Sequence, residues 1–353
     1  MLLIVTGVCL GCVGCGGTSS SAPPVTGAIA YLRGTGTQIG GQLVVMRVDG
    51  SRKRVLRHTF VDTTPVWSPD GSRIAFFSIL DKNREHTFID VVDRNAGGLR
   101  LLTPRSWLED CSWPVWTNDS STVAFTRNLG CDGDIGIYTV RADGTRLRAF
   151  FDPIGSDLAW SPDGRTVSYL GRRSALKSDL RLMDIDGSNR RGLTAADVLP
   201  IGGVPTTPPT AWSPDGSRIY YIDANQGISV IHRDNTRRRR VVTTTPQTKI
   251  GQGIYRVIEF ALSPNGKLIA FCAGDGKNKN LYVVHADGSG LQKLANMSMD
   301  PSWSPDGKWI AFDGTPKGTR GQIWIVNSDG RNLRDLSNDA SDDYAPAWAP
   351  ATR

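Results

Sequence analysis

A short phrase that recurs along the chain constrains its fold more than any other feature. Complete copies of Trp-Ser-Pro-Asp-Gly begin at Trp67, Trp160, Trp212 and Trp303. Weaker copies begin at Trp116 and Leu262, and a truncated copy begins at Trp348. Successive copies are 41 to 52 residues apart. Repetition at this period is typical of a β-propeller, in which each copy forms one four-stranded blade.

Each unit contains four predicted strands separated by turn signals. Apolar residues that lead into the tryptophan predict an inner strand, and Ser-Pro-Asp-Gly predicts a turn because Pro presets φ and Gly tolerates positive φ. An apolar stretch such as residues 74–76 is the second strand. A third strand, as at 281–284, ends at an Asp-Gly turn, and a short outer strand follows. We expect the phrase tryptophans to pack between blades and the turn aspartates to be structural.

The two ends of the chain predict one further blade. The residues after Trp348 suffice for an inner strand only, whereas residues 29–31 match a second strand with no inner strand before it. We therefore expect an all-β, seven-bladed β-propeller of four-stranded antiparallel blades over residues 28–353. It is closed by one C-terminal inner strand joined to three N-terminal strands. Such closure removes free sheet edges, which would otherwise aggregate.

The repeated Trp-Ser-Pro-Asp-Gly, Ile-Ala-Phe, Asp-Gly and Leu-Thr unit resembles the TolB-type, or PD40, propeller repeat. This repeat also occurs in the propeller domain of prolyl oligopeptidases. The resemblance implies the fold and says little about function, because propellers host many functions. The TolB propeller has six blades where this sequence predicts seven, so its role as partner of the peptidoglycan-associated lipoprotein is not carried over. The sequence also has no Gly-x-Ser-x-Gly nucleophile elbow.

The N-terminus carries the targeting signal. Its first 13 residues are small and apolar, too few to span a bilayer, which needs about 20. We expect a signal peptide over 1–14 and a flexible tether over 15–27. Residues 13–17 resemble a bacterial lipobox, which implies lipidation of Cys15, with Cys12 as second choice. The protein is then exported and held at a membrane, facing the periplasm or the cell exterior. Simple secretion is the first alternative, and no export is the second.

Export changes how the remaining cysteines are interpreted. Cys111 enters the inner strand of the second blade, and Cys131 follows the second strand of that blade, where the loop returns to the same rim. A disulfide between them would close a loop of about 20 residues and contribute roughly 3 kcal/mol in the chain-entropy model. We expect Cys272, within a second strand, to be a buried free thiol.

Acidic residues precede most inner strands, near the mouth of the central channel. They are Asp62, Asp110, Asp157, Glu259, Asp300 and Asp343, with Tyr344 beside the last. As a site, they would bind a basic or polyhydroxylated ligand or a hard cation such as Ca²⁺. Alternatively, they cap strand ends and face water. Because no compact Asp-x-Asp-x-Asp loop is present, we predict no cofactor and no metal site, with Ca²⁺ in the channel as the alternative.

Basic residues give the chain a net charge of +7. Some lie in second-to-third-strand loops, and the one basic run, residues 237–240, begins at the opposite rim without interleaved aromatics. No nucleic-acid module accompanies it, so we predict no nucleic-acid binding. That rim would instead contact anionic lipid or a cell-wall polymer.

The histidines argue against catalysis. His58, His86, His232 and His285 are assigned to outer strands, a loop and strand ends, so they do not converge on the channel. The sequence therefore predicts a non-catalytic, monomeric scaffold that binds a protein, peptide or glycan at the cell envelope. The alternative is a hydrolase or lyase at the channel mouth that uses Asp157, Glu259 and Asp300 as acid and base. An extracellular sensor or matrix component is a third hypothesis.

Overall fold

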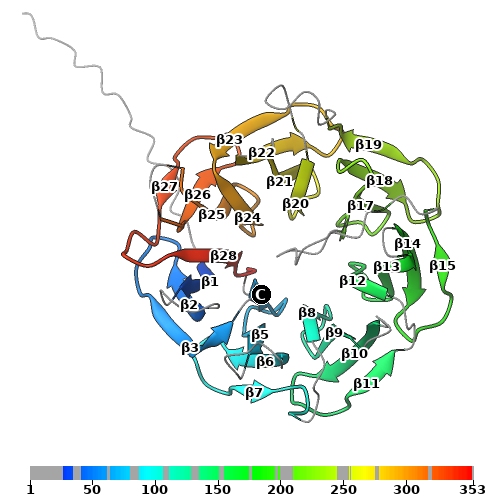
Figure 1. Cartoon of the computed structure of the whole chain (residues 1–353), viewed down its shortest axis with the longest axis horizontal. Coiled ribbons are helices and arrows are strands. Elements are labelled where there is room, and N and C mark those ends of the chain that lie inside the picture. The colour runs from blue at the N-terminus through cyan, green and yellow to red at the C-terminus, as the bar shows by residue number, and fades with distance from the viewer. Residues whose placement is uncertain are drawn as a thin grey trace, which may run out of the picture.

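The computed structural model describes twelve stretches of chain and two isolated residues. They are residues 27–34, 41–61, 64–79, 87–105, 111–128, 135–150, 155–174, 177–194, 198, 210–244, 254, 256–274, 278–316 and 320–351. The described strands form seven blades around a central axis (Figure 1). In these stretches there is no helix long and apolar enough to cross a membrane.

The blades follow the order of the repeats. Blade 1 consists of β4 (Val66–Trp67), β5 (Arg73–Ile79), β6 (Thr87–Asp93) and β7 (Arg100–Leu101). Blade 2 consists of β8 (Cys111–Trp116), β9 (Thr122–Asn128), β10 (Ile135–Arg141) and β11 (Arg148–Phe150). Blade 3 consists of β12 (Gly155–Trp160), β13 (Thr166–Ser174), β14 (Lys177–Asp184) and β15 (Arg191–Gly192). Blade 4 consists of β16 (Thr210–Trp212), β17 (Arg218–Ile222), β18 (Ile228–His232) and β19 (Arg239–Val242). Blade 5 consists of β20 (Arg256–Leu262), β21 (Leu268–Gly274), β22 (Lys279–His285) and β23 (Gln292–Asn296). Blade 6 consists of β24 (Ser298–Trp303), β25 (Trp309–Gly314), β26 (Gln322–Asn327) and β27 (Arg334–Asp335).

Blade 7 joins the two ends of the chain, as predicted. It consists of β28 (Asp343–Trp348), β1 (Ala28–Gly34), β2 (Gly41–Arg47) and β3 (Arg54–Val61). β28 pairs antiparallel with β1, with Ala347 opposite Ala30. The end of β3 also pairs with β5, through Phe60 and Ile79, so blades 7 and 1 form one eight-stranded sheet. This pairing ties blade 1 to the blade that closes the ring.

Tryptophans of the repeated phrase hold neighbouring blades together. Trp67 Nε1 donates a hydrogen bond to Ala347 O at 3.0 Å, and Trp303 Nε1 donates to Ala261 O at 2.9 Å. Trp116 and Trp212 bind the preceding blade in the same way. The predicted structural role of these tryptophans is confirmed. Because each bond crosses an interface between blades, the ring packs as a single body.

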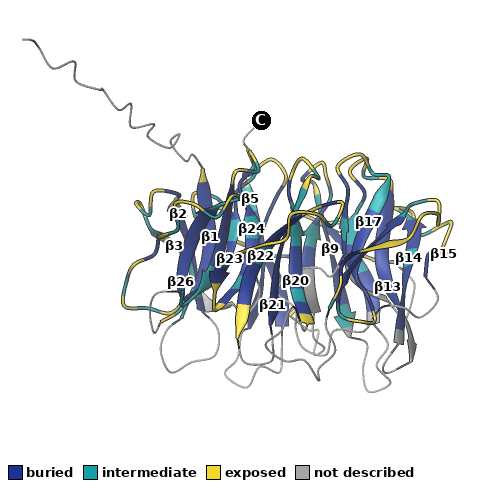
Figure 2. Ribbon diagram, turned by 90° about the horizontal axis from the view of Figure 1, so that it is seen from above, coloured by how far each residue is buried: buried dark blue, intermediate teal, exposed yellow. Residues whose placement is uncertain are grey.

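The two rims of the ring differ. We call the side that carries the Ser-Pro-Asp-Gly and Asp-Gly turns the turn rim, and the opposite side the loop rim. Exposed residues gather in the turns, and both the start of β1 and the C-terminal end lie at the turn rim (Figure 2). Arginines here bind the next blade: Arg73 Nη2 donates to Ser120 O at 2.7 Å, and Arg239 Nη2 to Ala286 O at 2.9 Å. Part of the positive charge is therefore used within the fold.

Candidate functional site at the channel mouth

Several predicted residues fall outside the described part of the chain. Asp62, Asp110, Cys12, Cys15 and Cys131 are among them. The backbones of Asp157 in β12 and Cys111 in β8 are described, but their side chains are not. Cys272 is a buried free thiol, as predicted. The remaining candidates are Glu259, Asp300, Asp343 and Tyr344.

A β-bulge interrupts the inner strands three residues before the repeated phrase. In β24, the register shifts between Met299 and Ser302, and Asp300 lies in the bulge with a φ of 53°. Asp157 lies in the equivalent bulge of β12, and Glu259 adjoins the register shift of β20. Bulges redirect a side chain away from the regular alternation of a strand. Three of the predicted acids thus occupy one structural position in three blades.

Glu259 and Asp300 belong to a chain of contacts across blades 5, 6 and 7. Both are buried, at 2% and 5% exposure. Glu259 Oε1 accepts a hydrogen bond from the backbone N–H of Asp300 at 2.6 Å. Asp313, in β25, interacts with the Asp300 side chain and accepts a hydrogen bond from the backbone of Ala345 in β28. These carboxyl groups therefore connect adjacent blades to one another.

Burial shifts the acidity of this cluster. Desolvation raises the pKa of Asp313 to about 6, and the nearby Glu259 charge adds to the shift, whereas hydrogen bonds oppose it. Cys272 lies beside Glu259, and burial followed by the neighbouring carboxylates raises the pKa of its thiol. The thiol is thus held in the protonated, unreactive form. The sequence did not indicate Asp313, because this residue lies near the end of a second strand. The predicted acids were those that precede or lie on inner strands.

Asp343 belongs to a second acidic group at the closure of the ring. Arg33 Nε, from β1, binds Asp343 Oδ1 at 3.1 Å, and Arg33 also pairs with Asp339. Lys53 Nζ binds Asp339 at 3.0 Å. Burial raises the pKa of Asp343 to about 6, although Arg33 lowers it. This network fastens the C-terminal strand to the N-terminal strands of blade 7.

The chemistry available to these acids is limited by their contacts. Glu259, Asp300 and Asp343 are buried and bind groups of adjacent strands or blades. Across the described stretches, no three His, Cys, Asp or Glu side chains are arranged to hold a metal ion. Of the two described histidine side chains, His285 lies exposed at the turn rim, with Nδ1 3.0 Å from Ser289 Oγ.

An exposed methionine lies between blades 5 and 6 at the loop rim. Met297, which connects β23 to β24, is 53% exposed and has a φ of 49°. Its carbonyl accepts a hydrogen bond from Thr315 N at 3.0 Å, which holds this backbone in place. Met299 lies two residues further on, and its sulfur accepts from Lys279 Nζ at 3.1 Å. We call Met297 and Met299 the methionine patch. The sequence did not predict this patch, because single methionines in a connection form no pattern.

Comparisons with known proteins support the propeller fold. A family model described as the TolB beta propeller domain, PD40, matches residues 170–353. The uncharacterized peptidase YuxL of Bacillus subtilis is 27% identical over 210 residues, which cover 56% of this chain and 28% of that protein. The Tol-Pal system protein TolB of Anaeromyxobacter dehalogenans is 29% identical over 193 residues, 49% of this chain and 41% of that protein. The matches thus span less than half of either relative.

A solved structure shows the same architecture. The crystal structure of TolB from Acinetobacter baumannii superimposes with a TM-score of 0.57 at 20% identity, over 92% of this chain and 67% of that chain. At this identity, the likeness shows the fold and leaves the function to be argued from the residues.

Proposed function

Because the chain belongs to the TolB β-propeller family, we propose that it is a non-catalytic binding scaffold of the cell envelope. In this proposal the protein is exported and anchored by a lipid on Cys15, and its loop rim binds a protein, peptide or glycan. It acts as a monomer without a cofactor. A relative named as a Tol-Pal system protein supports the envelope assignment.

The observation that carries the proposal is the methionine patch on the loop rim. Met297 is largely exposed, in a backbone conformation that side chains rarely adopt. Such strain persists where surrounding structure enforces it, and it often marks a functional position. Methionine is flexible and polarizable, which suits it to binding surfaces. The rigid ring below, joined by the Glu259–Asp300 contact, would present this patch without rearrangement.

A charge placed in the patch tests the proposal. The Met297→Glu protein, used as bait on a detergent-solubilised envelope fraction, should lose its partner, because binding would desolvate the new carboxylate. Leu291→Glu is the matched control: Leu291 is equally exposed, at 54%, but lies at the turn rim. Equal capture of one partner by both variants, measured by quantitative mass spectrometry, would refute binding through the loop rim.

A second candidate function is that of a hydrolase or lyase, which would cleave a peptide or carbohydrate at the channel mouth by hydrolysis or by elimination. The relative named as a peptidase favours it. Asp157, Glu259 and Asp300 would supply the acid and the base. In this case, the purified protein should turn over peptide or oligosaccharide substrates, and Asp300→Asn should abolish turnover while leaving the melting temperature within a few degrees. Turnover that survives this change would exclude Asp300 as a catalytic group.

A further inference from the structure

The ring of turns at the turn rim is incomplete at blade 7. In blades 1 to 6, a turn closed by a hydrogen bond joins the inner strand to the second strand, as between Gly71 N and Ser68 O. Neighbouring turns touch: Asp70 N donates to Ser120 Oγ at 3.1 Å, and Asn118 Nδ2 donates to Ser161 O at 2.9 Å. Blade 7 has no such turn, because its inner strand is β28 and its second strand is β1.

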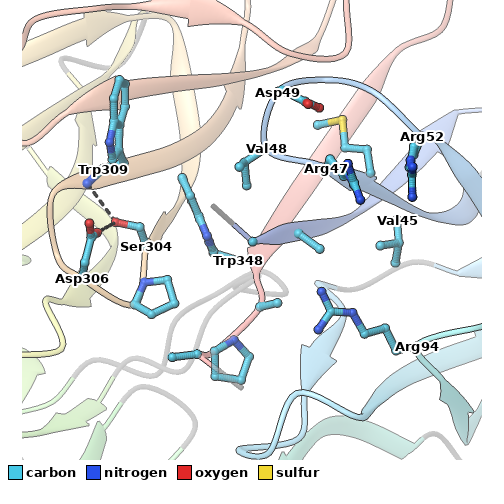
Figure 3. A pocket seen from close by; sticks show the side chains of 17 residues that line it. Val45, Arg47, Val48, Asp49, Arg52, Arg94, Ser304, Asp306, Trp309 and Trp348 are labelled. Atoms are coloured by element: carbon cyan, nitrogen blue, oxygen red, sulfur yellow. Dashed lines mark hydrogen bonds between the residues drawn. The ribbon is translucent and has the colours of Figure 1, made fainter. Parts of the chain in front are cut away.

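A cavity of about 900 Å³ lies at this gap. We call it the seam cavity (Figure 3). The blade 6 turn contributes Pro305, the chain after β28 contributes Pro350, and the start of β1 contributes Ala28. The cavity thus lies where a seventh turn would pack against the sixth. Its volume is in the range of cavities that hold small organic ligands, about 300–1,000 Å³.

Buried apolar side chains line part of the seam cavity. Trp309 comes from blade 6, and Met46, Val48 and Trp348 come from blade 7. Each of the four is at most 6% exposed. They form the floor of the cavity, and Pro305, Pro350 and Ala351 supply its accessible apolar surface.

Three arginines also line the seam cavity. Arg47 and Arg52 are exposed, and their side chains form no hydrogen bond or ion pair with another described residue. The Arg94 guanidinium lies 5.5 Å from the centre of the Trp67 ring. Both lining acids bind backbone N–H groups close in sequence: Asp49 accepts from Ser51, and Asp306 from Lys308. The Ser51 hydrogen bonds, followed by the nearby Arg47 charge, lower the pKa of Asp49. The lining therefore carries an excess of positive charge.

Two phrase tryptophans, Trp160 and Trp348, lack within the described stretches the indole hydrogen bond that the others make. Trp67, for example, donates its indole N–H to Ala347 in the preceding blade. The Trp348 indole N–H is buried and has no acceptor among the described residues, and the whole residue is 6% exposed. A buried donor without a partner is destabilising. The seam cavity thus adjoins the Arg47 and Arg52 guanidinium groups, and the Trp348 indole nitrogen lies buried beneath its surface.

We propose that the seam cavity binds a small amphiphilic organic anion. A carboxylate or phosphate group would pair with Arg47 and Arg52, because guanidinium groups bind these anions in bidentate fashion. The apolar body of the ligand would cover Pro305, Pro350 and Ala351, which lie above the buried Trp348 and Trp309. The site is separate from the methionine patch at the loop rim, so either proposal can fail alone.

Phenyl phosphate is the probe, and blade 2 supplies the matched control. Arg141 and Arg146 occupy the same turn positions in blade 2 as Arg47 and Arg52 in blade 7, and they are equally exposed. Blade 2 retains its inner turn, closed between Ser120 N and Thr117 O. Calorimetric titration of the full protein should give saturable binding. Arg47→Ala/Arg52→Ala should weaken it at least tenfold, and Arg141→Ala/Arg146→Ala should leave it within twofold.

The outcomes separate the sources of the anion. Competition by soluble glycerol phosphate would indicate a free or polymer-derived phosphate, whereas arginine-dependent sedimentation with phosphatidylglycerol vesicles would indicate a lipid headgroup. Either result supports the anion site if the seam variant alone loses binding. Equal loss in the two double variants would overturn the proposal. The proposal would also be overturned if the protein showed neither saturable phenyl phosphate binding nor vesicle binding. Melting temperatures establish that the natural protein and both double variants are folded.

Discussion

Buried acids of this protein serve as connectors between blades. Glu259 binds the backbone N–H of Asp300, and Asp313 reaches the backbone of Ala345. An Asp at positive φ, as at Asp300, is strained, and these bonds hold it in place. In the same cluster, the charge of the buried Asp313 carboxylate is poorly solvated. Its ionisation should therefore be visible in the stability of the whole ring.

The Asp313→Asn variant should be more stable than the natural protein at pH 8, by about 1–2 kcal/mol, because a neutral amide replaces a desolvated charge. The folded pKa of about 6 exceeds the ordinary value of 3.8. The folded state therefore binds the proton more tightly, and stability from this group falls as pH rises from about 4 to 6. The advantage of the variant should vanish near pH 4. Urea unfolding across this range measures it.

Asp215→Asn provides a control of opposite sign. Hydrogen bonds from Ser213 and Ser217 lower the pKa of Asp215 to about 2. Its contribution to stability is present above pH 4 and is lost as pH falls toward 2. This variant should be less stable than the natural protein at pH 7. An Asp313→Asn protein that is also less stable at pH 8 would show that the Asp313 charge is compensated.

Two phrase tryptophans differ in a way that mutation can measure. Trp212 Nε1 donates to Ala159 O at 3.1 Å and to Ser168 Oγ at 3.0 Å, whereas the buried Trp160 Nε1 has no acceptor in the described part of the chain. Replacement by Phe removes similar volume at both sites. Trp212→Phe should therefore cost about 1–2 kcal/mol more than Trp160→Phe in free energy of unfolding. Equal losses in denaturant titrations would mean that the indole hydrogen bonds contribute nothing net.

At the scale of strands and turns, the repeated phrase predicts most of the fold. The register of the turn residues and the alternation of apolar residues place each inner and second strand, because Pro, Gly and β-branched residues have strong local preferences. The bulges could not be predicted in this way. A bulge adds one residue to a strand without a distinct composition, yet Glu259 beside one bulge binds the backbone N–H of Asp300 within the bulge of the next blade. Their placement depends on contacts between blades.

Closure between β1 and β28 is the element on which the ring depends. A disulfide from Ala30→Cys/Ala347→Cys would link strands paired in register and close a loop of about 320 residues. Val66→Cys/Ala75→Cys, at the equivalent pair in blade 1, would close a loop of about ten. The chain-entropy model then predicts that the ring-closing disulfide stabilises by about 3 kcal/mol more. Urea unfolding of oxidised and reduced proteins tests this, and equal stabilisation would indicate that the ring ends stay together after unfolding.

For the whole molecule, the closed ring separates two surfaces with different chemistry. The loop rim presents the methionine patch, and the turn rim presents arginines, some of which bind the next blade. The sequence predicts the closure because residues 29–31 match a second strand. The seam cavity could not be predicted, because it arises from the packing of turns around the ring and from the one turn that blade 7 lacks.

Native mass spectrometry of the protein purified from the membrane fraction of its own host tests the envelope scaffold most directly. The natural protein should carry a diacylglycerol mass and a co-purifying partner, and Cys15→Ala should lose the lipid and leave the membrane fraction. Both proteins in the soluble fraction, with the same unmodified mass and no partner, would contradict an anchored binding scaffold.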